Sequence, residues 1–224
     1  MTSIAIIMFC QNNIEFEKLT KKINKKYSLK HNYDFYCFDK IPKHLINRAS
    51  CWCHLYYILE ILQNKNKFYQ YVLFIDSNTF ICNHNKRIED WITNDKNIYI
   101  GLDNSNPHIL KFSNPTSVIS NIIILKNTKW CIQFLHCLLI DLKFKEFWKY
   151  LNGVEIVFRK CLLYNFLNIK QNIKFIRNFN FNSYNNNLNK YITNGGWGFI
   201  LTNENDILHN VLLAKEFIKI NKLY

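Results

Sequence analysis

The chain has few of the residues that interrupt regular structure. Only 5 glycines and 3 prolines occur among its 224 residues, which excludes a loop-dominated or low-complexity protein. None of its 8 cysteines forms a Cys-x-x-Cys pair, and Cys51-Trp52-Cys53 has the wrong spacing for a zinc knuckle. We therefore expect mostly buried, inert thiols in a reducing compartment, without disulfides.

Long uncharged apolar runs are also missing. The apolar start over residues 3–10 is too short to span a membrane, and it lacks the basic flank and cleavage site of a signal peptide. We expect a soluble, cytoplasmic protein without a membrane span. The abundance of Asn, Lys and Ile is typical of AT-rich coding sequence, as in a large DNA virus or a protist.

The residues that are abundant indicate a well-packed globular protein. Hydrophobic residues make up 49% of the chain and aromatic residues 16%, and the length fits one domain over residues 1–224. The formal net charge of +13 is compatible with a nucleic-acid-binding protein. However, the lysines are spread along the chain, and the clearest cluster, residues 21–26, fits the solvated face of a helix. We therefore expect anionic small ligands and no nucleic acid.

Strand and helix patterns alternate along the chain, which predicts an α/β fold with a mostly parallel sheet flanked by helices. A loop over a site is expected at residues 104–116, and irregular structure at 178–189. Ser50 and Thr128 are the expected N-caps of two of the helices. The expected strands cover residues 3–10, 33–38, 71–75, 98–102, 117–125 and 173–176. The expected helices cover residues 14–27, 51–62, 86–92, 129–138, 144–151, 154–167 and 211–220.

The most informative stretch is the apolar run 71–75, which ends abruptly at Asp76-Ser77-Asn78. Such a run is typical of a strand buried on both faces. A charge at the carboxyl end of a buried strand lies where open α/β sheets bind their ligands. Asp76 and Asn78 can both direct oxygens at one cation if the chain turns there. The alternative interpretation is an ordinary solvated turn after a strand.

Four segments, in order, resemble the galactosyl/mannosyl transferase family of GT-A type nucleotide-sugar transferases, which includes fungal Golgi and plant xyloglucan enzymes. They are residues 30–36, residues 48–55 with the strand and turn at 71–78, residues 120–130, and residues 206–209. The resemblance covers residues 4–215 and implies a GT-A-like, Rossmann-type domain. It also implies a hexosyltransferase that moves a sugar from a nucleotide diphosphate sugar, UDP-linked, to a glycan or protein-linked sugar acceptor with retention.

The resemblance also implies roles for particular residues. Asp76, Asn78 and His209 are the implied ligands of a divalent metal, Mn²⁺ or Mg²⁺, and the turn Asp76-Ser77-Asn78 is the implied diphosphate site. The ion would act as a Lewis acid on the leaving diphosphate. For His209, a packed structural histidine is the alternative.

Further donor contacts follow from the same resemblance. The nucleotide base is expected on the loop after the first strand, made of Phe9, Cys10, Gln11 and Asn12. Asp103 and Glu155 are the candidate catalytic residues facing the donor sugar or acceptor, although Asp103 also fits a turn and Glu155 a carboxylate that complements a helix dipole. A cation could replace the metal, and the candidates are Arg48, Lys111 and Arg159.

Departures from the family pattern leave more than one function open. Asn78 stands where the family has a second Asp, and Asn121 stands where it has a Gly. An active transferase is the first hypothesis. A catalytically degenerate GT-A domain that binds sugar nucleotides or glycans is the second, and a basic nucleic-acid-binding domain is the third, with steeply salt-dependent binding as its signature.

Overall fold

The computed structural model describes residues 2–10, 15–102, 118–176, 180–182, 199–201 and 207–220. The helices, including short 3-10 turns labelled η, are α1 (Glu15–His31), η1 (Lys43–Leu45), α2 (Cys51–Leu62), η2 (Ile88–Trp91), α3 (Lys129–Ile140), η5 (Leu142–Phe147), α4 (Gly153–Leu163), η6 (Phe166–Asn168), α5 (Ile169–Asn172) and α7 (Ile207–Ile220). The strands are β1 (Ile4–Phe9), β2 (Asp34–Phe38), β3 (Tyr71–Asp76), β4 (Thr79–Ile81), β5 (Ile98–Leu102), β6 (Val118–Lys126), β7 (Ile173–Ile176), β8 (Asn180–Asn182) and β9 (Phe199–Leu201).

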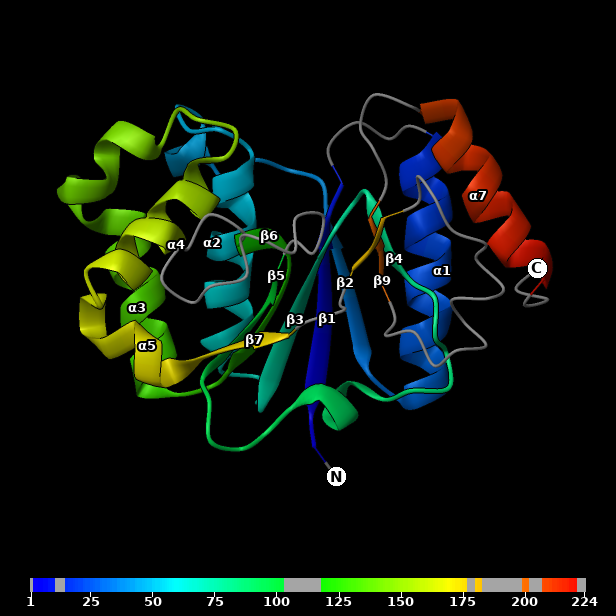
Figure 1. Cartoon of the computed structure of the whole chain (residues 1–224), viewed down its shortest axis with the longest axis horizontal. Coiled ribbons are helices and arrows are strands. Elements are labelled where there is room, and N and C mark those ends of the chain that lie inside the picture. Colours follow the sequence, from blue (N-terminus) through cyan, green and yellow to red (C-terminus); the bar gives the residue numbers. More distant parts are fainter. Residues whose placement is uncertain are drawn as a thin grey trace.

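Six strands form the main sheet in the order β2-β1-β3-β6-β5-β7 (Figure 1). The pairs β1–β2, β1–β3 and β5–β7 are parallel, whereas β6 runs antiparallel to both of its neighbours, β3 and β5. Five strands therefore point the same way, and the prediction of an α/β fold with a mostly parallel sheet flanked by helices is confirmed. A register shift between Ile100 and Gly101 interrupts the β5–β6 ladder.

The central strands β1 and β3 are buried on both faces of the sheet, as their apolar runs predict. Successive side chains point to opposite faces, so each strand contributes to two hydrophobic clusters. Ala5 and Ile7 pack with α2, α3 and α4, whereas Ile6 and Met8 pack with Tyr27 of α1. The helices accordingly form a layer on either side of the sheet, with α2, α3 and α4 on one side and α1 and α7 on the other (Figure 1).

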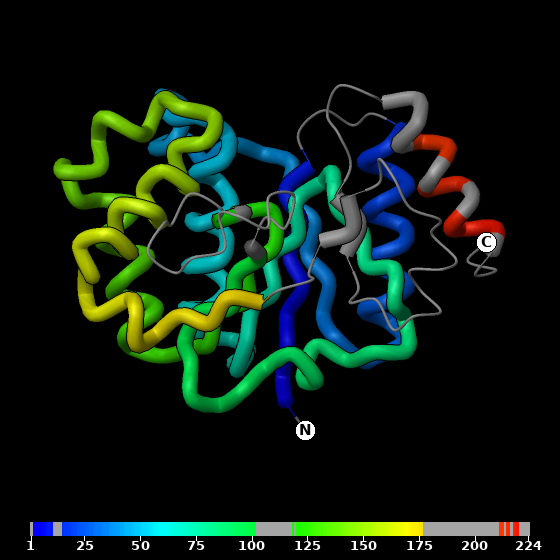
Figure 2. The backbone as a smooth tube through the Cα atoms, in the orientation of Figure 1, coloured from blue at the N-terminus to red at the C-terminus, as the bar shows by residue number. Residues whose placement is uncertain are grey.

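A second, three-stranded sheet in the order β4-β9-β8 lies on the α1 side of the molecule (Figure 1). Figure 2 shows the chain after β3 running alongside α1, where β4 contacts this helix. The pair β4–β9 is antiparallel and the pair β8–β9 is parallel. A third hydrophobic cluster joins α1, β4 and α7 through Phe16, Phe80 and Phe217. This cluster fixes the late helix α7 against the first helix of the chain.

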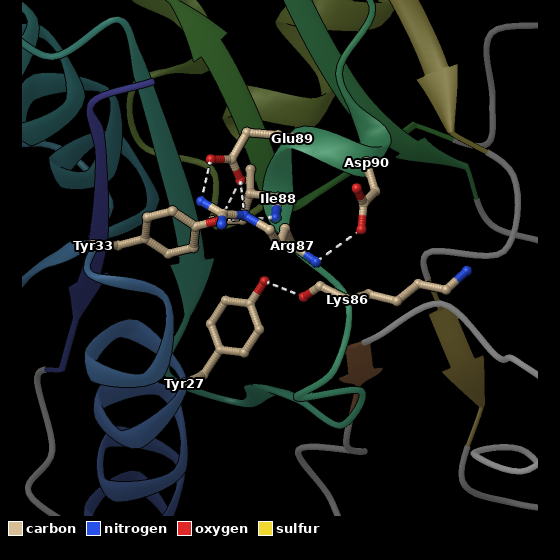
Figure 3. A network of polar contacts seen from close by, with 7 residues as sticks. All are labelled: Tyr27, Tyr33, Lys86, Arg87, Ile88, Glu89 and Asp90. Atoms are coloured by element: carbon tan, nitrogen blue, oxygen red, sulfur yellow. Dashed lines mark hydrogen bonds and ion pairs between the residues drawn. The ribbon is translucent and has the colours of Figure 1, made fainter. Parts of the chain in front are cut away.

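The amino ends of the parallel strands are covered by the segment that links β4 to β5, which includes η2 (Figure 1). The Tyr33 hydroxyl, just before β2, donates to the Glu89 carboxylate and accepts the Ile88 N–H at 3.2 Å. Arg87 pairs with the same Glu89 carboxylate at 2.9 Å. The Arg87 N–H donates to Asp90 at 3.0 Å, and the Tyr27 hydroxyl donates to the Lys86 carbonyl at 2.7 Å (Figure 3). We call these residues, 27, 33 and 86–90, the amino-end network.

Most predicted elements are present, with corrections at several boundaries. Thr128 caps α3 as expected, because its hydroxyl accepts the Cys131 N–H at 3.2 Å. Ser50 precedes α2 but makes no side-chain cap, since its backbone is already in the α-helical region. Helix α1 continues to His31, four residues further than predicted, and residues 142–147 form a 3-10 helix. Residues 180–182, predicted to be irregular, form β8, and neither β4 nor β9 was predicted. The loop predicted at 104–116 lies outside the described residues.

None of the helices in the described part of the chain combines the length and apolar character that a membrane span requires.

Candidate functional site

Asp76 is the last residue of β3 and lies at the carboxyl end of the main sheet. It is half-buried, and it stands opposite Phe9, the last residue of β1, in the parallel β1–β3 ladder. Its Oδ1 accepts the Asn78 N–H at 3.0 Å and lies 3.5 Å from the Ser77 hydroxyl, so Asp76-Ser77-Asn78 forms a tight turn into β4. The structure thus brings Phe9 and the whole Asp76–Asn78 turn to one edge.

Two buried polar side chains of α1 hold this turn in place. The Thr20 hydroxyl donates to the Ser77 carbonyl at 2.8 Å. The Asn24 amide donates to the Thr79 carbonyl at 2.9 Å, and its oxygen accepts the Ile81 N–H at 2.9 Å. Both side chains are fully buried, and leaving such backbone groups unpaired would cost about 1–3 kcal/mol each. Sequence analysis missed this pair, although two polar residues spaced by four on the inner face of a helix are a usable signal.

Glu155 reaches the same edge from the first turn of α4. Its Oε1 accepts the Ser120 N–H at 3.2 Å and lies 3.4 Å from the Ser120 hydroxyl. Since Ile75 pairs with Ile122 in the antiparallel β3–β6 ladder, Ser120 lies beyond the last pair, on the side where Asp76 ends β3. This geometry is compatible with both predictions for the Glu155 carboxylate, an interaction with the dipole of α4 and a place near the site.

A close backbone approach determines where α4 starts. An added Cβ at Gly153 would lie 2.2 Å from the Phe147 carbonyl oxygen and 3.0 Å from the Trp52 indole nitrogen. That carbonyl also accepts the Trp52 indole N–H at 3.4 Å. Gly153 therefore lets the first turn of α4, with Glu155, pack directly against α2 and η5.

Arg48, predicted to contact the donor, lies elsewhere. Its guanidinium stacks on the Trp148 ring at 3.5 Å from the centroid and donates to the Leu139 carbonyl at 2.7 Å. Burial lowers the pKa of this guanidinium. It lines a groove of about 930 Å³ beside α2 and the carboxyl end of α3, together with residues such as Tyr56, Glu60 and His136. The groove shares no residue with the Asp76–Asn78 turn.

Several predicted site residues cannot be placed. Gln11, Asn12 and Asp103 lie outside the described residues, as does Lys111. His209 lies in the first turn of α7, of which only the backbone is described. The backbone nevertheless brings the late chain to the site, because Leu201, the last residue of β9, pairs with Thr79, directly after Asn78. Residues 102 and 118, the last described residue of β5 and the first of β6, pair with one another at the same edge.

The donor set of the turn suits a hard cation. One carboxylate and one carboxamide, two residues apart, supply the oxygen ligands that Mg²⁺ and Mn²⁺ accept. Among the described residues, no three His, Cys, Asp or Glu side chains cluster as a metal site would require. The Asp76–Asn78 pair brings one carboxylate and one carboxamide oxygen.

Comparisons with known proteins agree on the fold. No family model and no curated protein matches the chain. The solved structure of a glycosyltransferase involved in the glycosylation of the major capsid of PBCV-1 is similar, with a TM-score of 0.65 and 15% identity over 96% of this chain and 99% of that one.

Two further solved structures are galactosyltransferase LgtC with donor and acceptor sugar analogues and GlyE of Streptococcus pneumoniae TIGR4. LgtC has a TM-score of 0.55 and 11% identity over 97% of this chain and 95% of its own. GlyE has a TM-score of 0.55 and 12% identity over 97% of this chain and 60% of its own. At these identities the likeness concerns the fold. The chain therefore has the fold of the GT-A glycosyltransferases. In its main sheet, β6 is the single antiparallel strand, and Asp76 ends the neighbouring strand β3.

Proposed function

We propose that this chain is a glycosyltransferase that moves a hexosyl group from a nucleotide diphosphate sugar, UDP-linked, to a hydroxyl of a glycan or a protein-linked sugar. The observation that carries the proposal is the position of two carboxylates at the same end of the main sheet: Asp76 ends β3, and Glu155 contacts Ser120 in the neighbouring strand β6. Ligands of open α/β sheets bind at this edge. The similar structures support the proposal, since LgtC was solved with donor and acceptor sugar analogues.

The donor diphosphate lies against the Asp76-Ser77-Asn78 turn in this proposal. Asp76 and Asn78 hold a Mn²⁺ or Mg²⁺ ion there, and His209 completes the ligand set from the start of α7. When bound, the ion supplies Lewis-acid neutralisation of the leaving diphosphate. Thr20 and Asn24 keep the two oxygen ligands in register, because they fix the backbone on either side of Asn78.

The remaining contacts follow from the strand ends. The base of the nucleotide rests on residues 9–12, directly after β1. Glu155 and Asp103 face the transferred sugar, with the Glu155 carboxylate oriented by its two contacts to Ser120. The anomeric configuration is retained. The positive net charge of +13 favours approach of an anionic donor.

The proposal extends to the whole chain and its compartment. Residues 1–224 act as one domain, because β4, which directly follows the Asp76–Asn78 turn, pairs with the late strand β9 in the second sheet, and the first helix α1 packs against the last helix α7. All eight cysteines are free thiols in the structure, which supports a reducing, cytoplasmic place of action.

Asn78 favours a second candidate function. Two carboxylates would bring two negative charges to a divalent ion, whereas this turn brings one. The Coulomb attraction between the turn and the ion is therefore weaker. A domain of this kind could bind sugar nucleotides or glycans without transferring the sugar. The bound diphosphate carries negative charges of its own, which restores metal affinity in the active alternative.

A donor panel distinguishes the two candidates. The purified chain is incubated with UDP- and GDP-linked sugars in Mn²⁺, Mg²⁺ or EDTA, and nucleotide release and nucleotide binding are measured in parallel. We expect metal-dependent release with at least one donor. Binding without release would support the binding module instead, and the absence of both across the panel would refute the proposed function.

A further inference from the structure

Two cysteines at the ends of neighbouring strands lie close enough to react with one another. Cys10 directly follows β1 and Cys37 is the fourth residue of β2, and the two strands are parallel neighbours. The Cys10 N–H donates to the Phe38 carbonyl at 2.8 Å, which fixes Cys10 beside the end of β2. The two sulfur atoms are 3.4 Å apart.

A disulfide requires the two strand ends to draw together from this arrangement. The S–S bond is about 2 Å long, and Cα atoms of disulfides are usually about 4.4–6.8 Å apart. Cys10 lies two positions beyond Met8, the partner of Cys37 in the parallel ladder, and such diagonal neighbours have Cα atoms about 7–8 Å apart, so the backbone that follows β1 must shift toward β2. Both thiols are half-buried, whereas Cys53, Cys82, Cys131 and Cys161 are buried. An oxidant from solution therefore has access to this pair and not to those four.

The surroundings favour one thiol as the nucleophile. The sulfur–sulfur contact with Cys10 and the positive charge of Lys21 lower the pKa of the Cys37 thiol to about 7, against the opposing effects of burial and of Asp39. The pKa of Cys10 is raised by the same sulfur contact, by burial and by Glu17, with Lys21 opposing them. Cys37 is thus the attacking thiolate near neutral pH, and Cys10 is the resolving thiol.

We propose that Cys10 and Cys37 form a reversible disulfide that makes this chain sensitive to low-molecular-weight disulfides such as oxidised glutathione. The Cys37 thiolate attacks one sulfur of the oxidant and releases one glutathione thiolate, which leaves a mixed disulfide on Cys37. Cys10 then loses its proton to solvent and attacks the Cys37 sulfur, releasing the second glutathione. Two protein thiols lose two electrons and one glutathione disulfide gains them.

The bond would act on the candidate site. Cys10 is the second residue of the proposed base-binding loop, and Phe9 beside it pairs with Asp76. Drawing the Cys10 sulfur toward β2 moves the start of that loop, so we expect oxidation to weaken binding of UDP by at least about tenfold. This consequence rests on the proposed function, whereas formation of the disulfide does not.

Peptide mapping tests the disulfide itself. The reduced chain is transferred to glutathione buffers of increasing oxidised fraction at pH 7, quenched in acid, alkylated, digested and analysed by mass spectrometry. We expect a linked pair of peptides containing Cys10 and Cys37, reversed by dithiothreitol. Loss of free Cys37 should be about tenfold faster than loss of free Cys137, a half-buried thiol on α3 that interacts electrostatically with the buried Cys161 but makes no sulfur–sulfur hydrogen bond within the described part of the chain.

Two variants separate the possible outcomes. Cys137→Ser should form the linked peptides as the unmodified chain does, and Cys37→Ser should form none. Persistence of both free thiols while Cys137 becomes glutathionylated would overturn the proposal, and so would linkage of Cys10 to any other cysteine. UDP titrations of the reduced and oxidised chains then test the consequence. If the reduced chain binds no nucleotide, the proposed function fails while the peptide result stands.

Discussion

The two ends of the main sheet carry polar residues in very different surroundings. At the amino end, the charge of Glu89 is paired with Arg87 and hydrogen-bonded by Tyr33, and η2 closes over the strands. At the carboxyl end, the half-buried carboxylates of Asp76 and Glu155 accept hydrogen bonds from backbone N–H groups and approach serine hydroxyls. At the amino end the carboxylate is paired with a guanidinium, and at the carboxyl end the carboxylates accept backbone N–H groups where open α/β sheets bind their ligands.

This difference separates stability from function. A paired and partly buried charge is expensive to disrupt, because removal of one partner leaves the other without compensation. A carboxylate at the ligand-binding end of the sheet acts on what binds there, so its removal should change binding more than it changes the free energy of unfolding. Substitutions at the two ends should therefore have opposite consequences for activity and stability.

The largest effect is expected from Asp76→Asn. This variant keeps an oxygen that can accept the Asn78 N–H, so the free energy of unfolding should change by less than about 1 kcal/mol. It removes the only carboxylate of the turn, and transfer activity should fall at least about 100-fold. Nucleotide release at saturating metal measures the activity, and unfolding in urea measures the free energy of unfolding.

Asp95→Asn is the matched control for that substitution. Asp95 is an exposed carboxylate at the opposite end of the sheet, in the segment between η2 and β5, and its substitution should leave activity unchanged. Equal activity of Asp76→Asn and the unmodified chain would show that the Asp76 carboxylate is not needed to bind the metal ion.

Acid should weaken the side of the molecule that carries the amino-end network, where His84 packs against Tyr27. Burial lowers the pKa of His84 to about 4, with further contributions from Lys30, His31 and Lys26, whereas its contact with the Ile81 carbonyl opposes the shift. The unfolded chain, with an ordinary histidine pKa near about 6.5, binds the proton first as pH falls. Stability is therefore present above about pH 6.5 and is lost as pH falls toward about 4.

The expected loss for His84 between pH 7 and pH 5 is roughly 2 kcal/mol. His54 of α2 is buried against the Phe74 ring, and burial lowers its pKa to about 3. Its protonation should therefore also lower the free energy of unfolding as pH falls. Urea unfolding of the chain and of His84→Gln at both pH values measures the share of His84. A variant that loses as much stability as the unmodified chain would refute this assignment.

Tyr33→Phe tests the amino-end network directly. It removes the acceptor of the buried Ile88 N–H and one donor to Glu89, so the free energy of unfolding should fall by about 1.5 kcal/mol, with activity per folded molecule unchanged. Tyr150→Phe, at a ring that is 54% exposed, is the control and should be neutral. A loss of activity without a loss of stability would reverse the roles of the two ends.

Much of the fold follows from local sequence patterns. The runs Ile4–Phe9, Tyr71–Asp76 and Ile98–Leu102 are continuous and β-favouring, so the strands and the carboxyl-end position of Asp76 are predictable. The cap at Thr128 follows from local hydrogen bonding. Ser50 fails because its backbone continues the helix, a conformation that the residue type alone does not determine.

Tertiary contacts decide what the sequence does not reveal. The strands β4, β8 and β9 have three residues each and pair with partners far along the chain, so no periodicity identifies them. Thr20 and Asn24 read as ordinary helix residues until β4 is placed against them. Arg48 was predicted to contact the donor because it belongs to a segment that resembles the family. Its stacking on Trp148 is a tertiary contact that this local resemblance does not reveal.

Asn78→Asp is the smallest of the expected effects and sharpens the comparison from the functional side. A second carboxylate in the turn adds one negative charge at the proposed metal, and affinity for Mn²⁺ in the absence of nucleotide should rise on the order of fivefold. The backbone N–H of residue 78 still donates to Asp76, so the turn should persist. Ser77→Asp, one residue earlier, is the positional control. If Mn²⁺ affinity rises equally in both variants, the gain reflects net charge alone and residue 78 is not a ligand.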